Sequence, residues 1–397
     1  MRAHPVSNGG YVKIHKRRTW RSARAKTGLK EMITVTKSDL PPLKKYVKYL
    51  ERIWASRWLT NDGELVQALG KELQDYLRVE SLALVSNGTL ALHLALKACE
   101  LKGEVITTPF TFAATTNVIL WEGLTPVFAD IDPATYNIDP EEVKKKITEK
   151  TSAILAVHVY GNPCYAEELQ EIACRHDLKL IFDAAHAFGV EYKNQSVLSY
   201  GDISTLSFHA TKVFNTIEGG AIICKDEKLL EKFKLLRNHG IKSEEQVVIP
   251  GTNAKMDEFQ AAMGLCNLEN MDEKIQRRKT IYEYYTKELS EQVKLQRIIA
   301  SRYNYSYMPV CFENTGKRNQ IYSELVRSGV RPRKYFFPLT VNFDYFKAQN
   351  SDLVKKHDLG IAFDTSNRIL CLPLYTDLGT ENAHRIVSII QNKIRDR

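Results

Sequence analysis

The sequence lacks any long hydrophobic run, and no apolar stretch approaches the roughly 20 residues that a membrane-spanning helix needs. No apolar segment follows the basic start of the chain, so the pattern of a secretory signal is absent. The seven cysteines are dispersed without a CxxC pair, and no zinc-ligand spacing occurs. An odd, scattered set of cysteines favours reduced thiols and a cytoplasmic location.

Negative charge is missing from residues 1–30, which contain nine Lys or Arg and no Asp or Glu. Because the whole chain has a formal net charge of +9, the remainder carries equal numbers of basic and acidic side chains. A basic segment of this kind can bind nucleic acid or an anionic membrane. The balanced remainder instead predicts that residues 1–31 are a disordered extension of an enzyme that begins near Met32.

Short apolar runs alternate with helical patterns over residues 81–224. Strands are expected at Ser81–Val85, Glu104–Thr107, Thr125–Asp130, Ala153–Val159, Lys179–Asp183, Ser204–Ser207 and Gly220–Cys224. Helices are expected at Lys44–Trp54, Glu64–Leu77, Thr89–Cys99, Ala113–Trp121, Pro140–Thr148 and Ala166–His176. The alternation predicts an α/β fold in which helices cover both faces of a mostly parallel sheet. Ligands of such sheets bind at the carboxyl ends of the strands.

The pattern changes after a helix that is expected around Asp257–Asp272. A long charged helix at Glu273–Gln292 is predicted to link two domains. Beyond it, the sequence predicts a strand at Tyr305–Cys311 and helices at Arg318–Ser328 and Glu381–Ile394. We therefore expect a large domain at residues 32–272, and a linking helix with a small α+β domain at residues 273–397.

The first candidate binding motif is the turn Ser86-Asn87-Gly88-Thr89, between a buried strand and a helix. Gly88 permits close backbone approach, and the N–H groups at a helix N-terminus suit a phosphate. A simple N-capped helix explains the same residues. Neither GxGxxG nor a Walker-type GxxxxGK[ST] pattern occurs, so dehydrogenase and ATPase functions lose support.

Two more strand ends carry candidate catalytic side chains. Asp183 ends a β-rich run in "LKLIFDAAHAFG", where it either faces a ligand or caps the next helix, and His186 follows it. Ser207 ends another strand, and Lys212 lies in an apolar, hydroxyl-rich segment between two apolar strands. A shielded lysine has a lowered pKa and can attack a carbonyl group.

A phosphate-type turn, an aspartate and a shielded lysine are the set that pyridoxal phosphate requires. Its aldehyde forms a Schiff base with lysine, its phosphate accepts N–H donors, and its pyridine nitrogen needs a carboxylate in order to stay protonated. The three elements follow different strands, which adds weight to this interpretation. A lone lysine on a solvated surface is the ordinary alternative.

Several ordered motifs resemble the DegT/DnrJ/EryC1/StrS family of sugar-nucleotide aminotransferases. They are "VSNGTLALHLAL", "TPFTFAATTN", "PVFADIDPATYNIDPE", "FDAAHAFG", "SFHATKVFNTIEGG" and "GTNAKMDEFQAAMGL", and the resemblance covers the chain from about Ile33 onward. It implies the type I aminotransferase fold, with a large α/β/α domain containing a mixed, mostly parallel sheet and a small C-terminal α+β domain. It also implies a homodimer with shared active sites.

The resemblance assigns roles to single residues. Lys212 matches the Schiff-base lysine, and Asp183 matches the acid at the pyridine nitrogen. The remaining positions match cofactor contacts: Gly88, Thr89 and Ser207 at the phosphate, Phe112 stacked on the ring, His186 at the ring hydroxyl where most members have Gln, and Asn253 at the phosphate of the neighbouring subunit. The segment "RKYFFPLT" resembles the one near the substrate, which makes Tyr335 a candidate substrate contact. The sugar diphosphate needs cationic contacts, for which His209 and residues of the other subunit are candidates. From the residues alone, Phe112 and Tyr335 fit core packing and Asn253 fits a turn.

Within the family, the sequence is similar to enzymes that make dTDP-4-amino-4,6-dideoxy-D-glucose. The implied reaction moves an amino group from L-glutamate, through pyridoxamine phosphate, to dTDP-4-dehydro-6-deoxy-D-glucose and releases 2-oxoglutarate. The implied destination of the sugar is lipopolysaccharide O-antigen or another surface glycan. Amination at C3 of a 3-keto sugar is one alternative. A dehydratase of the same fold is a further alternative, which is disfavoured because it has His in place of Lys212. An alternative of another class is a nucleic-acid-binding protein, which would need residues 1–31 for its main function.

Overall fold

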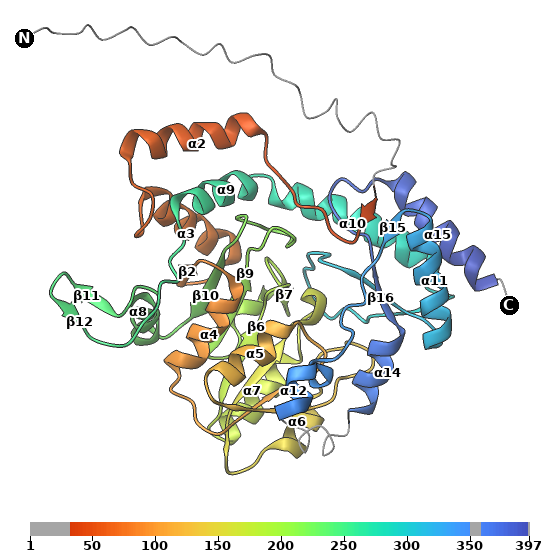
Figure 1. Cartoon of the computed structure of the whole chain (residues 1–397), viewed down its shortest axis with the longest axis horizontal. Helices are drawn as coiled ribbons and strands as arrows, with labels where there is room; N and C mark the ends of the chain where they lie inside the picture. The colour runs from red at the N-terminus through yellow and green to blue at the C-terminus, as the bar shows by residue number, and fades with distance from the viewer. Residues whose placement is uncertain (1–31, 350–358, 396–397) are drawn as a thin grey trace, which may run out of the picture. The chain divides into compact units, whose positions relative to one another are not determined.

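The central element is a seven-stranded sheet within the residues that the computed structural model describes, which are 32–349 and 359–395 (Figure 1). The predicted extension, residues 1–31, lies outside these ranges. The strands are β2 (Leu82–Val85), β3 (Glu104–Thr107), β4 (Thr125–Phe128), β5 (Thr151–Val157), β6 (Lys179–Asp183), β9 (Ile203–Ser207) and β10 (Gly220–Cys224). Their order is β2-β10-β9-β6-β5-β3-β4.

One strand runs against the others in this sheet. The pairs β4–β3, β3–β5, β5–β6 and β6–β9 are parallel, whereas β10 is antiparallel to both β9 and β2. It follows that β2, β6 and β9 point in the same direction and that their carboxyl ends share one edge. The predicted mixed, mostly parallel sheet is confirmed.

Helices cover both faces of the sheet, each over its own apolar core. On one face lie α4 (Gly88–Ala98), α5 (Ala113–Trp121) and α8 (Glu227–Leu236). On the other lie α2 (Leu43–Ser56), α3 (Glu64–Leu77), α6 (Pro140–Lys146), α7 (Ala166–Arg175) and α9 (Glu258–Leu268). Alternate residues of β6 face opposite cores: Leu180 and Phe182 pack with α3 and α7, and Ile181 packs with α4 and α5.

The C-terminal part builds a second, smaller sheet. Its antiparallel strands are β13 (Lys294–Leu295), β14 (Met308–Cys311) and β16 (Ile369–Leu372). A separate parallel pair is formed by β1 (Ile33–Thr34) and β15 (Val330–Arg331). Around them lie α10 (Met271–Leu289), α11 (Thr315–Arg327), α12 (Asp344–Gln349), α14 (Gly360–Arg368) and α15 (Thr380–Arg395). The start of α10 packs in the core of the large sheet and its end packs with α11 and α15. The boundary at residue 272 stays a prediction.

Local backbone turns account for the differences from the expected strands. The strand expected at Ala153–Val159 ends at Val157, because Tyr160 has a φ of 60° inside the 3₁₀ turn η1 (Val159–Gly161). The strand expected from Tyr305 begins at Met308, because Tyr305 has a φ of 53°. Several short elements were not predicted: β7 (Glu191–Tyr192), β8 (Gln195–Ser196), β11 (Ile241–Ser243), β12 (Gln246–Val247), η2 (Val197–Ser199) and η3 (Thr340–Asn342).

The length and polarity of the described helices show whether any of them could cross a membrane. Within residues 32–349 and 359–395, each helix is too short or too polar to traverse a lipid bilayer.

Candidate active site

Three chemically distinct features meet at the carboxyl edge of the large sheet. The turn at Gly88 follows β2, Asp183 ends β6 and Ser207 ends β9. Because β10 pairs Gly220 with both Val85 and Ser207, the end of β2 and the end of β9 lie one strand apart. The sequence placed these side chains after different strands, and the topology brings them to one edge.

The turn at the start of α4 has the form of an anion cradle. Asn87 is extended, with a φ of −167°, and its side chain accepts a hydrogen bond of 2.8 Å from the N–H of Leu90. The N–H groups of Gly88 and Thr89 have no protein partner in the described part of the chain. Two unpaired N–H groups at the positive end of a helix form a phosphate site.

Gly88 is required there by close packing against Ser207. A Cβ atom on Gly88 would lie 2.6 Å from the Cβ of Ser207 and 3.0 Å from its Oγ. The hydroxyl of Ser207 therefore lies directly beside the turn, in a position to join the two N–H groups in binding one anion. The predicted association of Gly88, Thr89 and Ser207 is consistent with this geometry.

We expect Gly88→Ala to weaken the binding of pyridoxal phosphate by about 10-fold or more, because overpacking of this kind costs about 1–3 kcal/mol. Gly70→Ala is the matched control: it lies inside α3, where a Cβ would meet its nearest neighbour at 3.9 Å. Titration of the apoenzymes with pyridoxal phosphate, followed by absorbance, measures the cofactor affinity of both variants. Equal affinity in the Gly88 and Gly70 variants would contradict the cradle.

Asp183 is buried, with an exposed fraction of 5%, and is held by two hydrogen bonds. Its Oδ2 accepts from the hydroxyl of Thr115 at 2.8 Å, and its Oδ1 accepts from the N–H of Ala185 at 3.1 Å. Burial raises the pKa of the carboxyl, while these two hydrogen bonds and the charge of Lys212 oppose that shift. The side chain is thus fixed in orientation and lies within electrostatic reach of Lys212.

Thr115 is a functional residue that the sequence analysis missed. It lies on α5, is fully buried, and its hydroxyl also contacts that of Thr111 at 2.9 Å. The hydroxyl-rich segment "TFAATT" after β3 was the available signal, because buried threonines beside a strand end need a polar partner. Through Thr115, helix α5 sets the direction of the Asp183 carboxylate.

Lys212 lies in the loop between β9 and β10, which we call the lysine loop (residues 208–219). Burial lowers the pKa of Lys212 to about 8, against the opposing charge of Asp183. Backbone hydrogen bonds close the loop at its base: Phe208 N–H donates to Gly219 at 2.8 Å, and Thr216 N–H donates to Phe208 at 2.9 Å. The lysine that the sequence predicts to be shielded is half-buried in this loop.

Buried amides brace the lysine loop from outside. The side chain of Asn215 donates to the carbonyl of Asp39 at 3.1 Å, and that of Asn267 donates to the carbonyl of Asn215 at 2.9 Å. The Asp39 carboxylate accepts from the hydroxyl of Thr376 at 2.8 Å and lies 3.9 Å from the buried Arg278. Both ends of the chain therefore support the segment that carries Lys212.

His186 is buried at the same edge as a neutral imidazole. Burial and the charge of Lys212 hold the pKa of His186 well below its usual range. Its Nδ1 atom is buried and has no partner among the described residues. Its ring meets Tyr307 edge-on with a centroid distance of 4.8 Å. An unpaired ring nitrogen beside Asp183 and Lys212 fits a hydrogen bond to a ligand.

The other predicted site residues lie at or near the surface. Phe112 precedes α5 and its side chain is 60% exposed, which excludes core packing. His209 is half-buried, and its Nδ1 lies 2.8 Å from the hydroxyl of Thr211. Tyr335 is half-buried beside Tyr307. Asn253 is exposed, and its side chain accepts a 2.9 Å hydrogen bond from Lys255 rather than bonding to the cradle of its own chain.

The features of this edge fit pyridoxal phosphate. The unpaired N–H groups of the cradle and the Ser207 hydroxyl match a phosphate, and the fixed Asp183 carboxylate matches a pyridinium nitrogen. The unpartnered Nδ1 of His186 matches a ring substituent that can hydrogen-bond. Together with the amine of Lys212, which lies within electrostatic reach of Asp183, these groups fit the phosphate, ring nitrogen and aldehyde of the cofactor that the sequence predicts.

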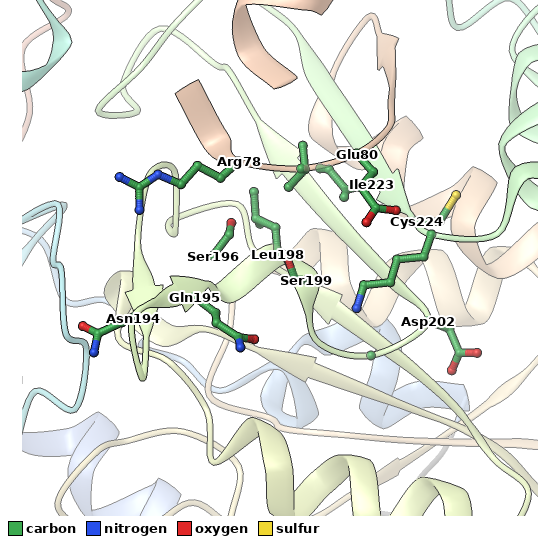
Figure 2. A pocket seen from close by; sticks show the side chains of 13 residues that line it. Arg78, Glu80, Asn194, Gln195, Ser196, Leu198, Ser199, Asp202, Ile223 and Cys224 are labelled. Carbon is green, nitrogen blue, oxygen red and sulfur yellow. The ribbon is translucent and has the colours of Figure 1, made fainter. Parts of the chain in front are cut away.

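A separate cavity of about 330 Å³ lies at the opposite edge of the sheet (Figure 2). Its wall includes Asp202, which precedes β9, and Cys224, which ends the antiparallel β10. The register pairs Cys224 with Ile203, at the start of β9 rather than at its carboxyl end. Lys212, Asp183 and Gly88 do not line this cavity, so it is not part of the candidate active site.

Comparison with known proteins identifies the family. The profile of the DegT/DnrJ/EryC1/StrS aminotransferase family matches residues 43–391. The dTDP-4-amino-4,6-dideoxy-D-glucose transaminase of Shigella dysenteriae is 41% identical over 368 residues, covering 91% of this chain and 99% of that protein. The GDP-perosamine synthase of Escherichia coli O157:H7 is 32% identical over 358 residues, covering 89% and 96%.

Solved structures agree in fold. The crystal structure of DesI in the presence of its TDP-sugar product has a TM-score of 0.86 at 34% identity and covers 93% of this chain and 95% of that one. NtdA from Bacillus subtilis, with bound cofactor PMP, has a TM-score of 0.83 at 28% identity, covering 89% and 82%. Aminotransferases of this kind depend on pyridoxal phosphate. The chain belongs to the DegT/DnrJ/EryC1/StrS aminotransferase family.

Proposed function

We propose that the protein transfers the amino group of L-glutamate to dTDP-4-dehydro-6-deoxy-D-glucose, giving dTDP-4-amino-4,6-dideoxy-D-glucose and 2-oxoglutarate. The observation that carries transamination is the pairing of a buried Asp183 with a Lys212 of lowered pKa, beside a phosphate cradle. The choice of sugar is supported by the Shigella dysenteriae relative, whose name specifies this product and which aligns over 91% of the chain.

The cofactor site is assigned from the groups that surround it. Gly88, Thr89 and Ser207 would hold the phosphate, and Asp183 would pair with the ring nitrogen. Phe112 would stack on the ring and the neutral His186 would contact its hydroxyl group. When bound, pyridoxal phosphate serves as an electron sink and as the temporary carrier of the amino group.

Lys212 has two tasks in this proposal. Because its pKa is about 8, roughly a tenth of its amine is neutral at pH 7, far more than at the ordinary pKa of 10.5, and this neutral fraction can bond to a carbonyl carbon. Once released by the incoming donor, the same amine can take the proton from the α-carbon of glutamate. The lysine loop and its braces keep the amine near the Asp183 carboxylate.

Asp183 stabilises positive charge at the ring nitrogen. A carboxylate fixed by Thr115 and Ala185 does not need to reorient as charge develops, and in a buried site its field is weakly screened. The acidity of the ligand's ring nitrogen is thereby lowered. Because burial keeps the imidazole of His186 neutral, this residue adds no second positive charge to the site.

We also infer the setting of the enzyme. A homodimer with shared sites is supported by Asn253, which is exposed and bonded to Lys255 rather than to the cradle of its own chain, so that it lies where a second copy would contact it. His209 and Tyr335 are proposed substrate contacts. Seven free thiols support a cytoplasmic location, and the amino sugar is proposed to enter a surface glycan such as O-antigen.

The product of the reaction tests this function. Wild-type protein, loaded with pyridoxal phosphate, is incubated with L-glutamate and dTDP-4-dehydro-6-deoxy-D-glucose, and the nucleotide sugar is examined by NMR. We expect the new amino group on C4 and an equal amount of 2-oxoglutarate. An amino group on C3, or no amino sugar in the presence of a fully loaded enzyme, would overturn the proposal. Removing residues 1–31 should leave the product unchanged.

A further inference from the structure

The segment Arg333–Phe337 is held rigidly at the edge of the active site. The backbone of Arg333 exchanges two hydrogen bonds with Cys371 in β16, at 3.2 Å and 2.8 Å. The hydroxyl of Tyr160 donates to the carbonyl of Tyr335, and that of Ser366 donates to the carbonyl of Phe336 at 2.6 Å. The backbone of the segment is therefore fixed on both sides, which gives its side chains defined positions.

Aromatic contacts connect this segment to the cofactor site. The ring of Tyr335 meets Tyr307 edge-on at 5.8 Å, and Tyr307 in turn meets His186 at 4.8 Å. The buried ring of Phe336 is parallel to that of His186 at 6.2 Å. One wall of aromatic rings thus runs from the residue beside Lys212 to the surface.

At Tyr335, the aromatic wall ends beside the positive charge of Arg333. The guanidinium of Arg333 lies 5.3 Å from the centroid of the Tyr335 ring, a cation–π contact that orients it. Among the described residues no carboxylate lies within ion-pair distance of Arg333. The adjacent Lys334 is directed elsewhere, since its Nζ lies 4.6 Å from the centroid of Tyr322 and 3.2 Å from the Oδ1 of Asn319. Within the described part of the chain, Arg333 is an oriented positive charge without a counter-ion.

We propose that Arg333 binds the diphosphate of the nucleotide sugar. This assignment rests on the proposed function, which supplies two anionic substrates. In glutamate, one carboxylate is attached directly to the reacting carbon and the other is close to it. In the sugar nucleotide, the whole width of the sugar ring separates the reacting C4 from the diphosphate. A cation at the far end of an aromatic wall matches the second spacing, and the planar fork of arginine suits phosphate oxygens.

The binding of dTDP tests this assignment without turnover. We expect Arg333→Gln in the loaded enzyme to weaken dTDP binding by about 10- to 100-fold in calorimetry, as loss of a charge-assisted contact would. Arg333→Lys should recover part of the affinity. Arg331→Gln is the matched control, because it removes an exposed arginine two positions away, in β15. The conversion of the loaded cofactor by L-glutamate alone, followed by absorbance, should be unchanged in all variants.

The possible results distinguish a wrong assignment of Arg333 from a wrong proposed function. If Arg333→Gln binds dTDP as tightly as wild type, or if it slows the glutamate half-reaction instead, Arg333 does not bind the diphosphate. If wild-type enzyme makes no 4-amino sugar, the proposed function fails whatever Arg333 does. Circular dichroism and melting temperatures of Arg333→Gln and Arg333→Lys, which are expected to match those of wild type, check that both variants still fold.

Discussion

Lys212→Ala is expected to reduce transamination by at least about 10⁴-fold, because it removes both the nucleophile that bonds the cofactor and the base that moves the substrate proton. The variant should still bind pyridoxal phosphate reversibly through the cradle. Borohydride treatment of wild-type protein should fix the cofactor to the peptide that contains Lys212, and treatment of the variant should fix none there. The steady-state rate measures the loss of transamination, and peptide mapping locates the cofactor that borohydride has fixed.

Two controls define the role of the amine. Lys212→Arg keeps the positive charge but supplies no neutral amine, so it should be as inactive as the alanine variant. Lys228→Ala, on the exposed face of α8, should retain wild-type activity. Activity in Lys212→Arg, or trapping of the cofactor on another lysine, would show that the wrong residue has been assigned.

The pH dependence follows from the same group. Burial lowers the pKa of Lys212 from 10.5 to about 8, so its neutral fraction increases as pH rises through that value. Incorporation of pyridoxal phosphate into the apoenzyme should accelerate from about pH 7 to about pH 9 and then level off. A rate that keeps rising toward pH 10.5 would mean that Lys212 is not shielded.

Asp183→Asn is expected to lower the rate by about 10²- to 10³-fold, the size of effect found when a preorganised electrostatic group is removed. Asparagine has nearly the same shape and can still accept the hydrogen bond from Thr115 through its single amide oxygen, but its NH2 group cannot accept from the N–H of Ala185. The loss should therefore combine the missing charge with one lost hydrogen bond. The glutamate half-reaction, followed by cofactor absorbance, measures it directly.

The thermal stability of Asp183→Asn should change much less than its activity. Burial raises the pKa of Asp183, so its contribution favours the folded state at low pH and is lost as pH rises through the folded pKa. At neutral pH, replacing the carboxylate with a neutral amide removes this penalty but also loses the hydrogen bond from Ala185, so the two effects oppose each other and the melting temperature of the apoenzyme should change little. A large fall in melting temperature would indicate that Asp183 is mainly structural.

Much of the large sheet could be predicted from the sequence because its strands are short, have apolar interiors and are bounded by polar or turn residues. Glu104–Thr107, Lys179–Asp183 and Gly220–Cys224 were predicted with the observed ends. Lys212 was identifiable because a lysine between two buried strands is shielded from the water that surrounds most lysines. The α/β fold followed from the order of these elements.

The supports of the site were not predictable, because each depends on contacts between distant segments. Thr115 acts through Asp183, 68 residues away, and Asn215 acts through Asp39, 176 residues away. The left-handed turn at Tyr160, which ended a predicted strand early, is fixed by packing rather than by a glycine. Local patterns carry no information on such pairings.

The bracing of the lysine loop has a consequence for the synthesis of the protein. Asp39 is translated before Lys212 and Asn215, and Thr376 follows Asn215 by 161 residues. A nascent chain that has only passed Lys212 already contains the reactive amine, but it lacks the hydroxyl that holds the Asp39 carboxylate and the strand β16 behind Arg333. Synthesis must therefore reach Thr376 before the bracing of the lysine loop is complete, and products that end before this residue should not capture pyridoxal phosphate in a catalytically competent form.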